Sequence, residues 1–121
     1  MAPTALVVDD HAAFRAVARR LLEGGGFEVV GEASDGAGAI AAARELRPDL
    51  VLLDIGLPDM DGIRVAERLA TEGARPTVVL TSGRESSDYG DRIAASAAAG
   101  FVSKGELTAG RLRAFVAGVA T

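Results

Sequence analysis

Short apolar runs recur along the chain between polar segments. These runs are almost continuously apolar, which is typical of strands in a parallel sheet whose two faces are both covered by helices. Turn-forming residues and helical patterns separate them, as expected for parallel strands joined by helical crossovers. The predicted strands are residues 5–8, 29–33, 50–53, 77–80 and 100–103.

The segments between the first four apolar runs have the periodicity of helices. Apolar residues three and four positions apart within 14–22 predict an amphipathic helix, which the glycines at 24–26 end. A second helix is predicted over 37–46, where the pair Arg47-Pro48 stops it, and a third over 63–72. These helices have the length of crossover connections in a parallel sheet.

The fourth and fifth helices differ in how clearly they are encoded. Ser86, Ser87 or Asp88 can cap a fourth helix that runs through Ile93 and Ala97, but its apolar stripe is weak, and we expect it to be mobile. The apolar pattern within 107–119 predicts the fifth helix. The pattern as a whole predicts the α/β class, as a (βα)₅ fold with a doubly wound five-stranded parallel sheet in the flavodoxin-like order 2-1-3-4-5.

Length and composition narrow the class of protein. With 121 residues we expect one domain over 1–121. The net charge of −4, with no long basic cluster, argues against direct binding to nucleic acid or an anionic membrane. The chain has no Cys and a single His, which excludes thiolate chemistry and a metal site built from imidazoles. We find no signal-peptide or membrane-span pattern and expect a cytoplasmic location.

Three carboxylates follow predicted strands. Asp9 and Asp10 come directly after the first strand, and Asp54 follows the third. In a parallel α/β sheet, ligands bind beyond the carboxyl ends of the strands, where the strand order reverses. Clustered acids repel one another, and a hard divalent cation relieves this by taking oxygen ligands. The sequence therefore favours a Mg²⁺ site.

A hydroxyl and an ammonium reach the same edge of the predicted sheet. Thr81 ends the fourth strand and Lys104 the fifth. Both groups are complementary to phosphoryl oxygens, and phosphoryl transfer requires positioning and charge stabilisation above all. The pattern indicates phosphoryl transfer to a carboxylate.

Four segments together resemble the motifs of response-regulator receiver domains, in the same order and at suitable separations. They are residues 7–11 (VVDDH), 53–62 (LDIGLPDMDG), 80–82 (LTS) and 100–104 (GFVSK). The resemblance covers essentially the whole chain. The Asp-Asp-His opening and the GEASDG stretch from Gly31 are most similar to receivers of the NarL/FixJ type.

The resemblance implies a role for each site residue. Asp54 is implied as the phosphoacceptor, Asp10 as a direct Mg²⁺ ligand, Asp9 as a ligand largely through water, and the Gly56 backbone carbonyl as a further ligand. Thr81 is implied as the switch hydroxyl, Lys104 as the charge partner of the phosphoryl group, and Phe101 as the aromatic residue whose burial changes with Thr81.

It also implies a function and partners. A sensor histidine kinase would phosphorylate Asp54, and the change would pass through Thr81 and Phe101 to an output domain or partner, with transcription as the regulated process. Such a protein is not a conventional enzyme, because it catalyses only its own phosphorylation and dephosphorylation. A C-terminal DNA-binding domain beyond this chain and a homodimer formed on phosphorylation are further expectations.

Other polar residues have plainer interpretations. Gly105 stands where many receivers have proline, so we expect a trans peptide and a less rigid loop after Lys104. Gly56 and Gly83, at two variable positions that tune hydrolysis in the family, offer no side chain. We interpret Asp59 and Asp61 as loop and helix-cap acids.

His11 opens the first predicted helix close to the carboxylates. An imidazole there could serve as a phosphohistidine or a general base. We interpret it instead as a surface residue of the first helical turn, near the acidic pocket.

Two other function classes stay open at this point. A flavodoxin-like enzyme or cofactor carrier would have the same topology, but it would need a phosphate-binding loop where this chain has Asp-Asp-His. A degenerate receiver that serves only as an interaction module usually lacks one of the acids or the lysine, and all of them are present here.

Overall fold

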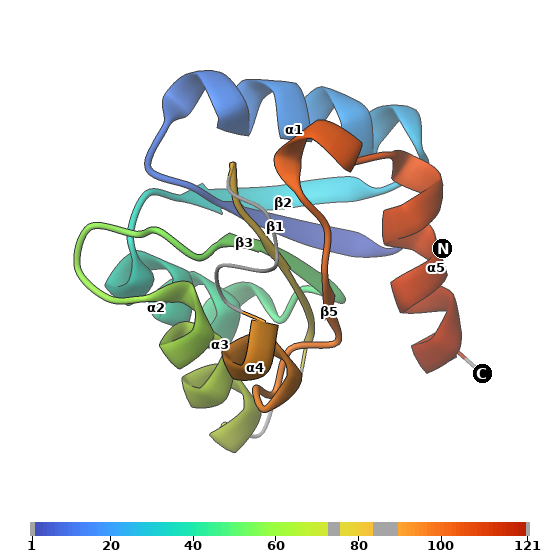
Figure 1. The fold of residues 1–121 in the computed structure, drawn as a ribbon. Coiled ribbons are helices and arrows are strands. Elements are labelled where there is room, and N and C mark those ends of the chain that lie inside the picture. The colour runs from blue at the N-terminus through green and yellow to red at the C-terminus, as the bar shows by residue number, and fades with distance from the viewer. Residues whose placement is uncertain (1, 73–75, 84–89, 121) are drawn as a thin grey trace.

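The computed structural model describes residues 2–72, 76–83 and 90–120. Strands and helices alternate along the chain, as the sequence pattern predicted (Figure 1). In chain order the elements are β1 (Thr4–Val8), α1 (Ala12–Gly24), β2 (Glu28–Ala33), α2 (Gly36–Leu46), β3 (Leu50–Asp54), α3 (Gly62–Thr71), β4 (Thr77–Thr81), α4 (Gly90–Ala94), β5 (Gly100–Phe101), the short 3₁₀ helix η2 (Lys104–Glu106) and α5 (Ala109–Ala120).

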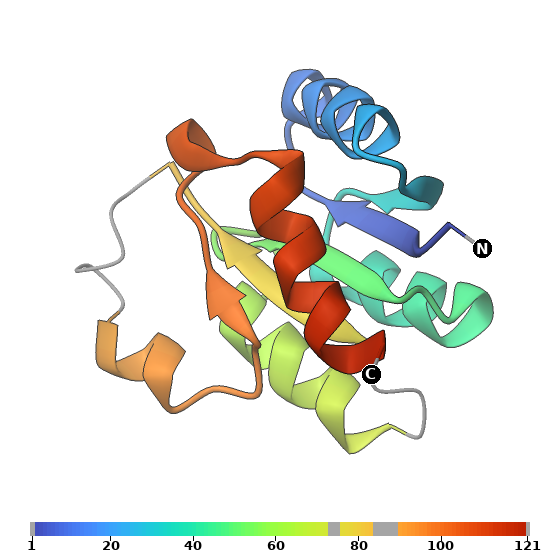
Figure 2. The same ribbon diagram turned by 90° about the vertical axis from the view of Figure 1, so that its right-hand side faces the viewer.

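The strands form one parallel sheet in the order β2-β1-β3-β4-β5, which confirms the predicted class and strand order. Helices α1 and α5 cover one face, and α2 and α3 cover the other (Figures 1 and 2). Because the order reverses between β1 and β3, the ends of these two strands border the crevice in which such sheets bind ligands.

Side chains of alternating strand residues fill the two layers. In β1, Ala5 and Val7 pack with the cluster under α1 and α5, whereas Leu6 and Val8 pack with the cluster under α2 and α3. The side chains of β3 alternate between the same two clusters, and its residues are buried on both faces of the sheet. This two-sided burial explains why the strands are almost continuously apolar in sequence.

Predicted helix ends agree with the structure for the first three helices. Helix α1 ends at Gly24, and Gly26 has a φ of 90°, a left-handed conformation that glycine adopts readily. Helix α2 ends before Arg47, itself left-handed. Helix α3 begins after Asp61, whose carboxylate accepts a hydrogen bond from the Ile63 N–H at 2.7 Å, so its predicted capping role is confirmed.

Strand β5 is shorter than predicted. It covers two residues instead of the expected 100–103. Beyond it, the Val102 N–H still donates to the Leu80 carbonyl at 3.0 Å and the Lys104 N–H to the Ser82 carbonyl at 3.0 Å. The segment therefore stays beside β4 while its backbone turns into η2, which ends the regular ladder early.

The last two helices also depart from prediction at their ends. Helix α4 stops at Ala94 rather than Ala97, because the Ser96 hydroxyl bonds the Ile93 carbonyl and accepts from the Ala98 N–H. Helix α5 begins at Ala109 rather than at residue 107, since the Thr108 hydroxyl accepts from the Arg111 N–H.

The predicted caps of the fourth helix, Ser86, Ser87 and Asp88, lie outside the described residues. Within the described part of the chain, no helix has both the length and the apolar character needed to cross a membrane.

Candidate functional site

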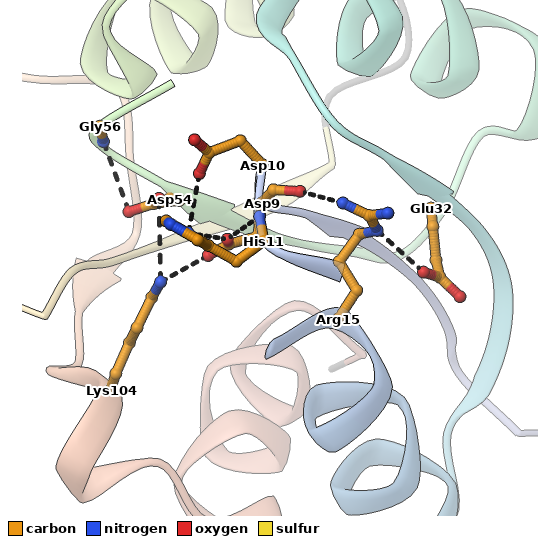
Figure 3. A network of polar contacts seen from close by, with 8 residues as sticks. All are labelled: Asp9, Asp10, His11, Arg15, Glu32, Asp54, Gly56 and Lys104. Carbon is orange, nitrogen blue, oxygen red and sulfur yellow. Dashed lines mark hydrogen bonds and ion pairs between the residues drawn. The ribbon is translucent and has the colours of Figure 1, made fainter. Parts of the chain in front are cut away.

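The parallel register brings three strand ends together. Val8 pairs with Leu53, so Asp9, the next residue after β1, lies beside Asp54 at the end of β3. Asp54 in turn pairs with Thr81 at the end of β4. Asp9, Asp54 and Thr81 are all buried, whereas Asp10 is more exposed. The predicted convergence at this edge of the sheet is therefore what the structure has (Figure 3).

The carboxylates form a tight cluster. One ligand atom each of Asp9, Asp10, His11 and Asp54 lies within 4.8 Å of the others. His11 Nδ1 lies 3.1 Å from Asp9 Oδ1 and 3.0 Å from Asp10 Oδ1. His11 thus lies near the acidic pocket with most of its side chain exposed, as expected for a residue of the first helical turn.

Lys104 supplies the positive charge at this edge. Its Nζ lies 2.6 Å from Asp9 Oδ2 and 3.8 Å from Asp54 Oδ2, and its side chain is 22% exposed (Figure 3). The peptide bond between Lys104 and Gly105 is trans, as predicted. A mostly buried ammonium between two buried carboxylates compensates part of their charge.

Burial raises the pKa of Asp54 above the usual value for an aspartate, and the neighbouring charge of Asp9 raises it further. Lys104 and the Gly56 N–H, which donates to Asp54 Oδ1 at 3.3 Å, oppose this rise in pKa. The charged form of Asp54 is therefore under electrostatic strain, and an additional cation at the cluster would relieve it.

Thr81 contributes a hydroxyl that is fully buried. Its Oγ1 has no hydrogen-bond partner among the residues that the structure describes. A buried hydroxyl without a partner is unfavourable, so such a group in a site indicates a ligand atom that it can bind. Phe101, which pairs with Leu80, is half-buried against the core cluster beneath α3.

Glycines bring the loop after β3 close to the site. A side-chain carbon at Gly62 would lie 2.4 Å from the Asp54 carbonyl oxygen and 2.8 Å from the Ile55 Cα, so only glycine fits there. Gly56 lies next to Asp54, and a side chain on it would meet nothing within 4 Å. Metal ligation by the Gly56 carbonyl stays a prediction.

Arg15 is a polar partner of the site that sequence reasoning missed. Its guanidinium donates to the Asp9 carbonyl oxygen at 2.6 Å and pairs with Glu32 of β2 at 3.1 Å (Figure 3). It holds the backbone of the loop that carries the carboxylates. The signal in the sequence was its place one helical turn after His11, on the side of α1 that faces the site.

Asp59 also has a partner that local sequence did not indicate. Its carboxylate accepts from the N–H groups of Gly36 at 2.7 Å and Ala37 at 2.9 Å, and so caps α2 from the loop before α3. These backbone hydrogen bonds lower the pKa of Asp59. Asp59 and Asp61 both lie outside the carboxylate cluster, as predicted, and the capping of α2 by Asp59 is an addition from the structure.

Comparison with known proteins agrees with this geometry. The family model of the response regulator receiver domain matches residues 5–117. BvgA of Bordetella pertussis, named as a transcription regulator of virulence factors, is 44% identical over 101 residues, which make up 84% of this chain and 48% of BvgA. The DNA-binding transcriptional activator EvgA of Escherichia coli is 33% identical over 102 residues, which are 84% of this chain and 50% of EvgA.

A solved receiver structure has the same fold as this chain. The signal receiver domain of the response regulator NarL from Mycobacterium tuberculosis matches with a TM-score of 0.83 and 32% identity, and covers 98% of this chain and 94% of that one. The chain spans about half the length of the curated relatives it matches. From its sequence and its fold alike, the chain belongs to the response regulator receiver domain family.

Proposed function

We propose that this chain is a phosphorylation-dependent switch, in which Asp54 accepts a phosphoryl group with the help of Mg²⁺. The observation that carries the proposal is the buried Asp54 carboxylate, which lies in a cluster with Asp9 and Asp10 and within 3.8 Å of the Lys104 ammonium. An acceptor oxygen, a place for a cation and a fixed positive charge are the groups that phosphoryl transfer to a carboxylate requires.

The donors present fit a hard divalent cation. Asp9, Asp10 and Asp54 offer carboxylate oxygens, the ligand type that Mg²⁺ prefers. Burial first, and the charge of Asp9 second, raise the pKa of Asp54, and a cation would favour its charged form. Asp10 and Asp54 would bind directly together with the Gly56 carbonyl, and Asp9 largely through water. The bound cation would neutralise charge on the transferring phosphoryl oxygens.

The reaction moves one phosphoryl group. An Asp54 carboxylate oxygen attacks phosphorus in line with the donor, a phosphohistidine of the kinase or a small acyl phosphate. The bond between phosphorus and the donor atom breaks as the new bond to Asp54 forms. Lys104 stabilises the negative charge on the phosphoryl oxygens. Hydrolysis later returns Asp54 and inorganic phosphate, so the chain catalyses only reactions on itself.

The switch rests on Thr81 and Phe101. The buried Thr81 hydroxyl is free to donate to a phosphoryl oxygen, which would draw the end of β4 inward. Phe101 lies on the neighbouring strand β5, where it pairs with Leu80, the residue before Thr81, and it is half-buried against the core cluster beneath α3. We propose that its burial changes when Thr81 moves.

The signalling context follows from the family. A sensor histidine kinase is the proposed donor. The relatives BvgA and EvgA are named as transcription regulators, and the chain matches about half of each, so we propose a DNA-binding output domain in the whole protein. In this proposal residues 1–121 form the receiver, which dimerises on phosphorylation, and DNA contacts come from the output domain.

A phosphodonor experiment tests the proposal. Acetyl phosphate with Mg²⁺ is expected to add one phosphoryl group, on Asp54, as measured by intact mass and peptide mapping. Asp54→Asn should abolish the labelling, and so should chelation of the metal. The matched control is Asp59→Asn, a nearby carboxylate engaged in capping α2, which should label as the wild type does. Equal labelling of the Asp54→Asn protein would exclude Asp54 as the acceptor.

A further inference from the structure

The ring of Phe14, in the first turn of α1, lies against the Lys104 ammonium. The Nζ atom is 4.2 Å from the ring centroid, well inside the range of a cation–π interaction. We propose that Phe14 is a positioning residue for Lys104, whose ring holds the ammonium at the phosphorylation site. This inference rests on the proposed function, in which Lys104 binds the phosphoryl group.

The backbone of Lys104 does not by itself set the position of the ammonium group. The Lys104 N–H is fixed by the Ser82 carbonyl at 3.0 Å, but this bond anchors only the main chain. The next residue is Gly105, where a side chain would meet nothing within 4 Å, so the space beside Lys104 on that side is open. Because a lysine stem has four rotatable carbons, the place of the ammonium depends on what it contacts.

The carboxylate contacts of Lys104 change during the proposed reaction, whereas its contact with the ring persists. Asp9 is a proposed metal ligand, so its carboxylate is shared with the cation when metal binds. When Asp54 becomes an acyl phosphate, the charge of its carboxylate is replaced by the charge on the phosphoryl oxygens, which lie further out. The Phe14 ring carries no titratable group, and it is packed against the core cluster beneath α1 and α5. Its attraction for the ammonium therefore does not depend on the charge of Asp54.

The geometry also allows the movement that the reaction needs. Nζ lies 2.6 Å from Asp9 and 3.8 Å from Asp54, so a small shift brings it to the phosphoacceptor. A cation stays attracted to a ring up to about 6 Å from its centroid, so the contact survives such a shift. Phe14 thereby limits the ammonium to the region between the two carboxylates.

Lys104 is the only lysine in the chain, which gives a direct probe of the contact. Labelling with ¹³C-lysine yields one set of side-chain NMR signals. The ε-methylene protons should be shifted upfield by the ring in the wild type and return to the random-coil position in Phe14→Leu. Phe14→Tyr keeps an aromatic ring and should keep the shift. Equal lysine shifts in the wild type and Phe14→Leu would overturn the proposal.

The effect on the site is measured with beryllium fluoride, a phosphoryl mimic, in the presence of Mg²⁺. Phe14→Leu should bind the mimic about three- to tenfold more weakly, the size expected for a partly buried cation–π contact. Phe14→Tyr should restore the affinity. The control is Phe27→Leu, which removes a ring from the same core cluster without a contact to lysine and should leave the affinity unchanged.

A double-mutant cycle separates positioning from general loss of packing. If Phe14 acts through Lys104, Phe14→Leu should weaken mimic binding in the wild type but have no further effect in Lys104→Met. Equal effects in both backgrounds, or unchanged affinity of Phe14→Leu, would overturn the positioning role while the phosphorylation site stands. Failure of the wild type itself to bind the mimic would instead refute the proposed function, and the positioning role with it.

Discussion

Lys104 pairs more closely with Asp9 than with Asp54: the ammonium lies 2.6 Å from the Asp9 carboxylate and 3.8 Å from that of Asp54. Asp9 is fully buried and is the nearer partner of this ammonium. Burial and then the charge of Asp9 raise the pKa of Asp54, and the more distant Lys104 offsets only part of this rise. The residue proposed as phosphoacceptor thus lies further from the ammonium than the other buried acid does.

Asp54→Asn should stabilise the metal-free protein at neutral pH. Folding raises the pKa of Asp54. At pH values between the ordinary and the raised pKa, the folded protein therefore binds more protons than the unfolded protein. The free energy of unfolding of the wild type therefore falls as pH rises through this window, and the loss persists above it. We expect the free energy of unfolding of the Asp54→Asn protein to be about 1 kcal/mol higher than that of the wild type at pH 7, a usual size for a stabilising substitution.

Urea unfolding of both proteins in the presence of a chelator, as a function of pH, measures this difference. The gain should disappear as pH falls below the ordinary pKa of aspartate, where Asp54 is neutral in both states. An Asp54→Asn protein that is less stable than the wild type at pH 7 would show that Lys104 compensates Asp54 fully.

Magnesium should bind the free protein weakly and through the strand ends. Amide NMR shifts on titration are expected at Asp10, Asp54 and Gly56. Asp10→Asn should weaken binding by about tenfold or more, since even loss of an outer partner of a metal site has an effect of this size. Asp59→Asn is the control, because that carboxylate is engaged with α2. Shifts that cluster elsewhere would exclude this metal site.

Thr81→Ala should uncouple binding from the conformational response. The Thr81 hydroxyl has no described hydrogen-bond partner, so its removal should change the free energy of unfolding by less than about 1 kcal/mol. The variant should still bind beryllium fluoride, but hydrogen exchange across residues 90–101 should gain less protection than in the wild type.

Thr77→Ala, at the opposite end of β4, is the matched control for this experiment and should respond as the wild type does. If the wild type and Thr81→Ala gained equal protection across residues 90–101, the switch would not pass through this hydroxyl, even with the phosphorylation site confirmed.

Gly62→Ala should destabilise the fold and distort the site, whereas Gly56→Ala should not. A methyl group at Gly62 would meet the Asp54 carbonyl oxygen at 2.4 Å, and this neighbour is backbone that cannot rotate away. We expect a loss of about 1–3 kcal/mol or more in urea unfolding, as for other overpacked sites. At Gly56 the methyl group meets nothing within 4 Å, and a change within about 0.5 kcal/mol is expected. Equal stabilities would contradict the close approach of α3 to the end of β3.

The sequence by itself determined the elements and the edge of the sheet at which the site lies. Strands buried on both faces must be almost continuously apolar, so periodicity locates them. Residues that follow such strands must meet at one edge, so Asp9, Asp54 and Thr81 could be placed together before any distance was known. These conclusions hold because they depend on local pattern and on a general rule of parallel sheets.

The tertiary structure alone decided how the groups pair at that edge. Asp59 caps a helix more than twenty residues earlier, Arg15 holds the Asp9 carbonyl, and the Phe14 ring meets Lys104. The contacts of Asp59 and Phe14 join segments far apart in sequence, and the contact of Arg15 depends on how α1 packs beside the end of β1. Hydrogen bonds, ion pairs and cation–π contacts depend on interatomic distances, because their energies fall off within a few ångströms, and only packing of the whole chain sets them.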